Sequence, residues 1–255
     1  PTTLENPMKS TLAKTLAVVA VVALPALASA QLTANVSLTS NYKFRGQDQD
    51  VIGKNGSIKD KAVKPALQGG LDYAHESGFY IGNWNSSVNW LAGNSLESDI
   101  YGGYKFKAGE IDMDVGLLTY IYPGNSLGNT TEAYAGATFG PLSAKYSHTL
   151  SEDYFGWAGT SLGSGLKGRN TGYLNLAFAQ EVAPKLTFKA SVGFTRFASD
   201  IKDNGVPNYM DYSVGGAYDL GEGFSLGANV VGANKRGFFG PVNKNRLIVS
   251  ITKTL

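Results

Sequence analysis

Residues 32–44 read LTANVSLTSNYKF, and apolar and polar side chains alternate along almost the whole stretch. One face carries Leu32, Ala34, Val36, Leu38, Tyr42 and Phe44, and the other carries Thr33, Asn35, Ser37, Thr39, Asn41 and Lys43. A period of two predicts a β-strand with one apolar and one polar face. The stretch is longer than the roughly 5–6 residues of a usual soluble strand, and it reaches the roughly 9–11 residues that cross a bilayer. It therefore predicts a transmembrane strand.

The chain after this stretch repeats the pattern, and turn residues divide it into twelve candidate strands. They lie near residues 32–44, 65–75, 79–90, 96–107, 111–122, 131–140, 142–150, 170–180, 186–197, 208–219, 224–233 and 246–255. Connections after even-numbered strands are short, whereas those after odd-numbered strands are mostly longer and polar, with LAGNS (91–95) as the exception. Outer-membrane barrels sort their connections in this way. We therefore predict an all-β fold, a transmembrane antiparallel β-barrel of about twelve strands over residues 31–255.

Residues 1–30 are predicted to contain a few residues upstream of the true start at Met8, followed by a cleavable signal peptide. Met8 and Lys9 begin a short basic region, the apolar run TLAVVAVVALPALA follows at 15–28, and the A-x-A site predicts cleavage after Ala30. A buried amphipathic helix is the alternative, but the run has no polar face. Export and a barrel together predict residence in a bacterial outer membrane, with its lipid as a partner.

Composition excludes several classes of protein. Charged residues make up 16 % of the chain, well below the roughly 25 % of soluble domains. The net charge of +2, without a cluster of Lys or Arg, argues against a nucleic-acid partner. The absence of cysteine excludes disulfides and thiolate metal sites. No stretch after the signal peptide has 18 consecutive apolar residues, so the sequence predicts no transmembrane helix.

Aromatic residues lie towards the ends of several predicted strands. They are Tyr42, Phe44, Trp84, Trp90, Tyr120, Tyr122, Tyr209 and Tyr212. Tyr and Trp favour the headgroup layer of a bilayer, so we expect these side chains at the membrane surfaces.

The stretch LESDIYGGYKFKAGEIDMDVGLLTYIYP (96–123) carries carboxylates two residues apart, which could form a catalytic or metal site or a polar strand face. In a barrel the charged face must be the lumen, because a charge that faces lipid costs on the order of 2–4 kcal/mol. The predicted pore-lining residues are Glu97, Asp99, Lys105, Asp112, Asp114, Glu132, Lys145, Lys189 and Asp211. We also place Asn83 and Asn85 on this face. A four-residue KAGE turn would pair Phe106 with Ile111 and set Lys105 opposite Asp112.

A strand number of twelve does not decide whether the lumen is open or closed. The barrel falls between filled eight-stranded barrels and open porins of 16–18 strands. Its lumen could hold a narrow water column, or side chains and an infolded loop could close it.

Catalysis and metal binding are weaker hypotheses. The two histidines, His75 and His148, belong to no recognisable nucleophile arrangement, so no enzyme and no cofactor is predicted. Asp48, Asp50, Asp60 and Asp203 lie in predicted outer loops and could bind Ca²⁺. Nearby lysines favour solvated loop charges over a calcium site, and we predict no metal.

The chain ends RLIVSITKTL, an alternating strand predicted to close the barrel and to be recognised by the barrel-assembly machinery. Outer-membrane barrels usually end in an aromatic residue, and Leu255 departs from that pattern.

Several segments resemble the TorF family of porins. They are SNYKFRG (40–46), PALQGGLDY (65–73), GFYIGNWNSSV (78–88), LESDIYGGYKF (96–106), YPG (122–124) and EAYAGATFG (132–140). The resemblance implies a porin-like role in the outer membrane, with no defined substrate and no catalytic residues.

The sequence favours a passive channel for small solutes or ions with weak charge selectivity. The alternative is a closed structural or adhesive barrel that acts through loops 45–64 and 151–169. A soluble, lipocalin-like barrel is a third reading, but it would need an apolar interior.

Overall fold

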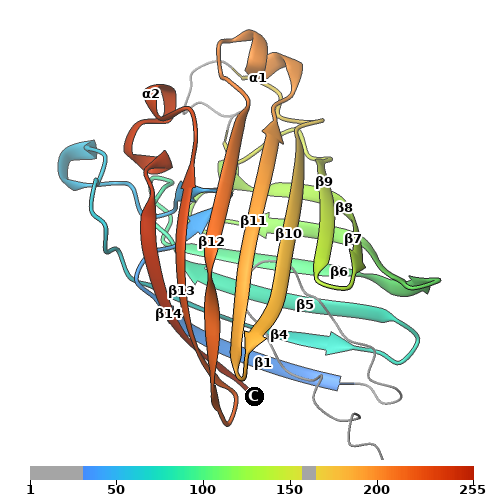
Figure 1. Cartoon of the computed structure of the whole chain (residues 1–255). Coiled ribbons are helices and arrows are strands. Elements are labelled where there is room, and N and C mark those ends of the chain that lie inside the picture. The colour runs from blue at the N-terminus through green and yellow to red at the C-terminus, as the bar shows by residue number, and fades with distance from the viewer. Residues whose placement is uncertain (1–30, 157–164) are drawn as a thin grey trace, which may run out of the picture.

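The structure, a computed structural model, describes residues 31–156 and 165–255, and the predicted signal peptide lies outside these residues. Twelve antiparallel strands form one closed barrel, in which the first strand pairs with the last (Figure 1). They are β1 (Gln31–Thr39), β4 (Ala66–Ala74), β5 (Phe79–Ser87), β6 (Leu96–Ala108), β7 (Ile111–Ile121), β8 (Thr130–Phe139), β9 (Leu142–Thr149), β10 (Gly172–Ala183), β11 (Leu186–Arg196), β12 (Tyr209–Gly221), β13 (Phe224–Ala233) and β14 (Arg246–Thr254). The predicted fold class and strand number are confirmed.

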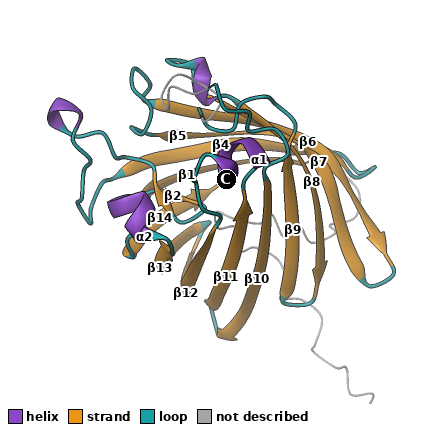
Figure 2. Cartoon of the chain, turned by 90° about the horizontal axis from the view of Figure 1, so that it is seen from above, coloured by secondary structure: helices purple, strands orange, loops and turns teal. Residues whose placement is uncertain are grey.

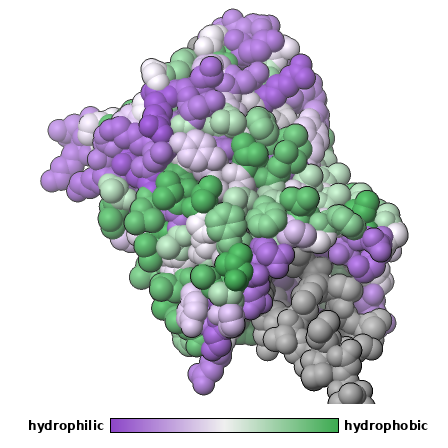
Figure 3. All heavy atoms as spheres, viewed as in Figure 1, coloured by the Kyte–Doolittle hydropathy of each residue, from purple (hydrophilic) through white to green (hydrophobic). Residues whose placement is uncertain are grey.

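The alternation of the sequence decides which side of each strand faces out. On β1, Leu32 and Leu38 are 68 % and 54 % exposed on the outer surface, whereas Ser37 and Thr39 are buried on the inner face. The outward residues of the other strands form an apolar band across the face in Figure 3, and polar side chains gather above it. No helix within residues 31–156 and 165–255 is long and apolar enough to cross a bilayer.

The connections sort by length between the two ends of the barrel, as predicted. The turn rim consists of the short turns at 75–78, 109–110, 140–141, 184–185 and 222–223. The loop rim consists of the connections at 40–65, 88–95, 122–129, 150–156 with 165–171, 197–208 and 234–245. It carries the short helices α1 (Ser199–Asp203) and α2 (Arg236–Phe239) and the 3-10 turns Lys54–Gly56, Ser126–Gly128 and Gly240–Asn243.

The β6–β7 hairpin corrects the predicted register. Ala108 pairs with Ile111, so the turn consists of Gly109 and Glu110 alone. Gly109 has a φ of 65°, a conformation that glycine adopts without strain. Lys105 therefore lies opposite Asp114, not opposite Asp112. The shift is of two residues, and an even shift leaves every side chain on its predicted face.

The first predicted strand ends earlier than expected. β1 stops at Thr39, and the chain then turns into the ring of strands (Figure 2). Within residues 41–50, which we call the inner hairpin, β2 (Lys43–Phe44) pairs with β3 (Gln47–Asp48). Arg45 and Gly46 form its tip, with φ values of 47° and 76°. Two successive positive φ values are typical of a two-residue hairpin turn.

Two aromatic clusters fill the barrel beneath the loop rim. One contains Val88, Leu91, Tyr120 and Tyr122, with Tyr42, Phe44, Trp90, Leu118 and Phe155 packed against it. The other contains Tyr154, Leu166, Phe197, Ile201, Val206, Tyr209 and Ala233, with Phe155 and Phe239 packed against it. Trp84 also faces inward, against Tyr42. Seven of the eight aromatic residues expected at the membrane surfaces therefore lie inside, and that prediction is wrong for all but Tyr212.

Candidate channel interior

The pairing of the strands brings four predicted residues onto one line. Lys105 pairs with Asp114, and the line continues through Gly136, Lys145, Asn175 and Gly193 to Asp211. Paired residues of neighbouring strands share a face, so this inward line crosses β6 to β12. Its charged members alternate in sign. The line begins near the turn rim at Lys105 and ends near the loop rim at Asp211.

Five residues form a central cluster at the β5–β9 wall, of which Tyr134 is buried and the others are half-buried: Tyr80, Lys105, Asp114, Tyr134 and Lys145. The Tyr80 hydroxyl donates to Asp114 Oδ1 at 2.6 Å and contacts the Tyr134 hydroxyl. The ammonium of Lys105 lies 4.6 Å from the Tyr80 ring centroid, and that of Lys145 lies 3.8 Å from the Tyr134 ring centroid. Each lysine therefore has both a cation–π contact and a carboxylate nearby.

Inward glycines let the phenol groups of the cluster lie along the wall. A Cβ at Gly103 would come within 2.6 Å of the Tyr80 hydroxyl, and a Cβ at Gly116 within 2.5 Å of the Tyr134 hydroxyl. Larger residues at these positions would push the rings towards the barrel axis. The glycines thus keep space open in the half of the barrel nearer the turn rim.

The other predicted residues divide between the two halves of the barrel. Asp112 forms an ion pair of 2.7 Å with Lys107 near the turn rim, and Lys189 is half-buried on the inner face of β11. Glu97, Asp99, Glu132 and Asp211 are at most 7 % exposed beneath the inner hairpin. These four carboxylates face inward as predicted, but they are buried among loop residues and do not form a wet wall.

Asn83 and Asn85 contradict the sequence expectation. They pair with Ile100 and Ser98 on the outer surface, so Trp84 between them points inward. Asn85 donates to Asn83 Oδ1 at 2.5 Å, and Asn83 donates to the Asp99 carbonyl oxygen at 2.9 Å. The two amides form hydrogen bonds with one another and with the backbone, which lowers the cost of placing them on the outer surface.

Arg45 carries the tip of the inner hairpin to the opposite wall. Its guanidinium pairs with Glu132 Oε2 on β8 at 2.7 Å and donates to the Tyr154 hydroxyl at 3.1 Å. It also lies 4.2 Å from the ring centroid of Tyr173 on β10. Burial alone would lower the pKa of Arg45, but Glu132 together with Tyr154 and Tyr120 outweighs that effect and holds the pKa well above its ordinary value. The guanidinium therefore stays charged inside the barrel.

Asp48 anchors the base of the inner hairpin. Its carboxylate is fully buried and lies 2.6 Å from the Lys64 ammonium, 3.2 Å from the Lys43 ammonium and 3.4 Å from the Arg246 guanidinium. Burial lowers the pKa of Lys43 to about 8, although Asp48 acts in the opposite direction. Asp60 pairs with Lys244 and Arg246, whose hydrogen bonds hold the pKa of Asp60 below its ordinary value.

The loop carboxylates that were considered as calcium ligands are paired with basic side chains. Asp50 pairs with Lys59 at 2.6 Å, and Asp203 lies 3.5 Å from Lys202. Asp48 is a buried anchor and not the solvated loop charge that the sequence suggested. Within residues 31–156 and 165–255, no group of three or more His, Asp or Glu side chains is arranged to hold a metal ion.

Sequence reasoning missed two kinds of interior residue. Asp72 on β4 accepts a hydrogen bond of 2.5 Å from Tyr101, and its period-two phase with Gln68 could have placed it on the inner face. Arg45 lies in a loop, where alternation assigns no direction. Its role depends on a partner 87 residues away.

A closed antiparallel barrel with a polar interior and an apolar outer band is the architecture of porins, and solved porins share this fold. KdgM porin aligns with a TM-score of 0.54 at 10 % identity, over 87 % of this chain and 98 % of that chain. NanC porin aligns with a TM-score of 0.53 at 12 % identity, over 88 % and 98 %. A KdgM porin complex with disordered oligogalacturonate gives a TM-score of 0.52 at 9 % identity, over 87 % and 97 %.

The chain belongs to the family described as "Bacterial protein of unknown function (Gcw_chp)", whose model matches residues 25–254. The family description does not carry the TorF name, which stays an expectation from the sequence. No curated protein matches the chain.

Proposed function

We propose that this protein is an outer-membrane channel for small solutes or ions, with the loop rim outside the cell and the turn rim in the periplasm. The observation that carries the proposal is the interior of alternating charge inside a closed barrel with an apolar outer band. The inward line carries charges of both signs, which favours a weak ion preference over selection for ions of a single sign. The fold shared with KdgM and NanC porins supports the same class.

The inner hairpin makes this a narrow channel that is constricted on the outer side. Its tip crosses the barrel to β8, and Phe44 and Phe155 pack together beneath the loop rim. The half nearer the turn rim keeps half-exposed charges on its wall. Passage therefore requires movement of the inner hairpin or a path around it.

A closed structural or adhesive barrel is the second candidate, and the inner hairpin inside the barrel favours it too. Buried ion pairs and two aromatic clusters could hold the outer half shut permanently. Conductance separates the two candidates. The purified protein in planar bilayers is expected to give discrete current steps, and a repeatable absence of steps would favour the closed barrel.

The wall residues are tested by charge removal. Asp112→Asn with Asp114→Asn removes two negative charges from the inner face near the turn rim, so reversal potentials under a salt gradient should shift towards anion preference. Asp200→Asn with Asp203→Asn removes the same charge from α1, outside the interior, and is the matched control. An equal shift in the two double variants would count against a pore lined by Asp112 and Asp114.

A further inference from the structure

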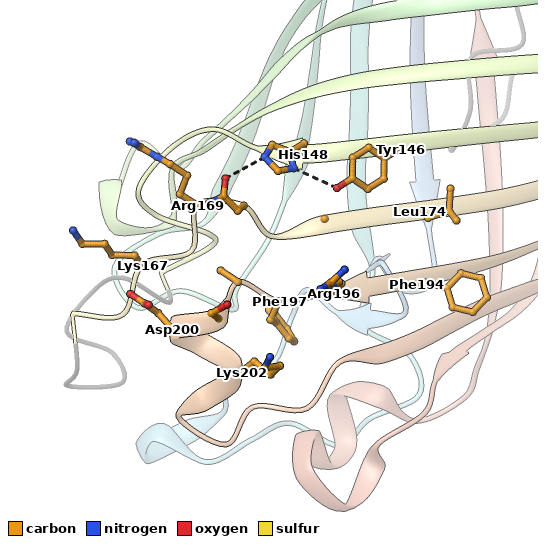
Figure 4. A pocket seen from close by; sticks show the side chains of 14 residues that line it. Tyr146, His148, Lys167, Arg169, Leu174, Phe194, Arg196, Phe197, Asp200 and Lys202 are labelled. Carbon is orange, nitrogen blue, oxygen red and sulfur yellow. Dashed lines mark hydrogen bonds between the residues drawn. The ribbon is translucent and has the colours of Figure 1, made fainter.

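A hollow of about 710 Å³ lies on the outer surface of β9, β10 and β11, at the loop rim (Figure 4). We call it the rim hollow. Four cationic side chains line it: Lys167, Arg169, Arg196 and Lys202. Its apolar floor consists of Tyr146, Leu174 and Phe194. It lies outside the barrel, so the channel interior does not use it.

The strand register arranges the rim hollow in rows. The row nearest the loops is His148, Gly172 and Arg196, and the next is Tyr146, Leu174 and Phe194. The third row, Ala144, Leu176 and Val192, is apolar throughout. Rows are two residues apart, about 7 Å along a strand. The surface therefore changes from cationic to hydrocarbon within one row, which is the profile of a membrane–water interface.

Tyr146 packs over the glycine of the first row. A Cβ at Gly172 would come within 2.6 Å of the Tyr146 hydroxyl, so the absent side chain leaves room for this phenol between His148 and Arg196. His148 is held in place by Asn170 Oδ1, 3.2 Å from Nε2, and by the Tyr146 hydroxyl, 3.3 Å from Nδ1.

The cations of the rim hollow are poorly neutralised. Neither Arg169 nor Arg196 has an ion pair or hydrogen bond from its guanidinium to another residue in the described part of the chain. Lys167 reaches Glu152 at 3.7 Å and Lys202 reaches Asp203 at 3.5 Å, but all four side chains are more than 50 % exposed. Among the described residues that line the hollow, Asp200 is the one carboxylate. Two free guanidinium groups above an apolar floor match a phosphate that carries acyl chains, since guanidinium binds phosphate through two parallel hydrogen bonds.

We infer that the rim hollow binds a phosphate-bearing lipid of the outer leaflet. Arg169 and Arg196 hold the phosphate, Lys167 and Lys202 flank it, and an acyl chain runs along Leu174 and Phe194 towards the apolar third row. The inference rests on the proposed location and orientation in the outer membrane and not on conductance. Lipid held at this point would fix the height of β9–β11 in the bilayer.

The test is the binding of bis-phosphorylated lipid A to the purified full-length mature protein in detergent, measured by native mass spectrometry. Arg169→Gln with Arg196→Gln should weaken binding about fivefold for each arginine, on the order of 25-fold together. Lys54→Gln with Lys61→Gln removes the same charge from the 45–64 loop and should change affinity by less than about twofold. Arg169→Lys with Arg196→Lys keeps the charge and should retain more affinity than the Gln pair.

Three results would overturn the inference: unchanged affinity in the Gln pair, equal binding of lipid A without its phosphates, or full competition by millimolar inorganic phosphate. The last would indicate a site for free anions. Heat-modified migration in gels checks that every variant is folded. Conductance of the Gln pair should equal that of the unmodified protein, so loss of lipid binding and loss of channel function are separate readouts.

Discussion

Replacing Arg45 with alanine is expected to release the inner hairpin from the barrel wall. The guanidinium makes the ion pair with Glu132, the hydrogen bond to Tyr154, and cation–π contacts with Phe44 and Tyr173. Both charged side chains are at most 5 % exposed. Truncation of Arg45 therefore removes the link between hairpin tip and wall and leaves a buried carboxylate without its cation.

The expected size of the effect follows from that burial. Breaking a buried ion pair by removing one partner costs about 3–5 kcal/mol. A loss of about 3 kcal/mol from the docked state changes the ratio of docked to released hairpin roughly 150-fold, since 1.36 kcal/mol is a factor of ten. A hairpin that is docked in nearly all molecules would then be released in a measurable fraction of them. The stranded Glu132 should also lower the free energy of unfolding.

Single-channel recording in planar bilayers measures the release. Arg45→Ala should give larger or more frequent open levels than the unmodified protein. Lys59→Ala is the matched control, because its pair with Asp50 lies in the same loop, with both side chains about 30 % exposed, and such pairs contribute about 1 kcal/mol or less. Arg45→Ala with Glu132→Gln removes both charges, so stability should recover while conductance stays high. Unchanged open levels in Arg45→Ala would refute the hairpin as the constriction.

Two further perturbations test the packing and the electrostatics of the interior. Gly116→Ala should destabilise the barrel by about 1–3 kcal/mol in urea unfolding, because the new Cβ would lie 2.5 Å from the Tyr134 hydroxyl and from the Gly102 carbonyl oxygen. Gly136→Ala should be nearly neutral, because the atom nearest to its new Cβ would be 3.6 Å away. Equal losses of stability in the two variants would contradict the close packing at Gly116. Lys43 has a folded pKa of about 8 against an ordinary 10.5, so the unfolded chain binds more protons between these values and stability should rise with pH, by about 3 kcal/mol at most. Urea midpoints from pH 7 to 10 should show this rise relative to Lys43→Met, and parallel profiles would argue against it.

Strand faces and boundaries could be predicted because a period of two is local information. Asp112 and Asp114 lie on the inner face of β7 as expected, although the register was wrong by two residues. β5 shows where the reasoning failed. Exposed Phe79 and Ile81 set the outward phase, and Asn83 and Asn85 continue it. Assigning Asn to the inside because it is polar ignored that phase.

The infolding of the first loop could not be predicted in the same way. Tyr42 and Phe44 continue the apolar phase of β1, and alternation does not distinguish a face packed on lipid from one packed on an aromatic cluster. The contacts that decide the matter join residues far apart in the chain, as Arg45 and Glu132 do. Burial of Glu97 has the same origin, because its carboxylate accepts hydrogen bonds from Tyr42 and Tyr122 once the inner hairpin is in place.

The interior holds two sets of charges whose surroundings imply different roles. Around Arg45 and Asp48 the charges are buried, paired across the barrel and costly to separate, so they hold the inner hairpin in one position. Around Asp114 and Lys145 the charges are partly exposed on the wall, beside Tyr80 and Tyr134, so a passing ion can reach them. In the proposed channel, this arrangement separates the control of opening from the control of selectivity. Changes at Arg45 should therefore alter how often current flows, and changes at Asp114 should alter which ions carry it.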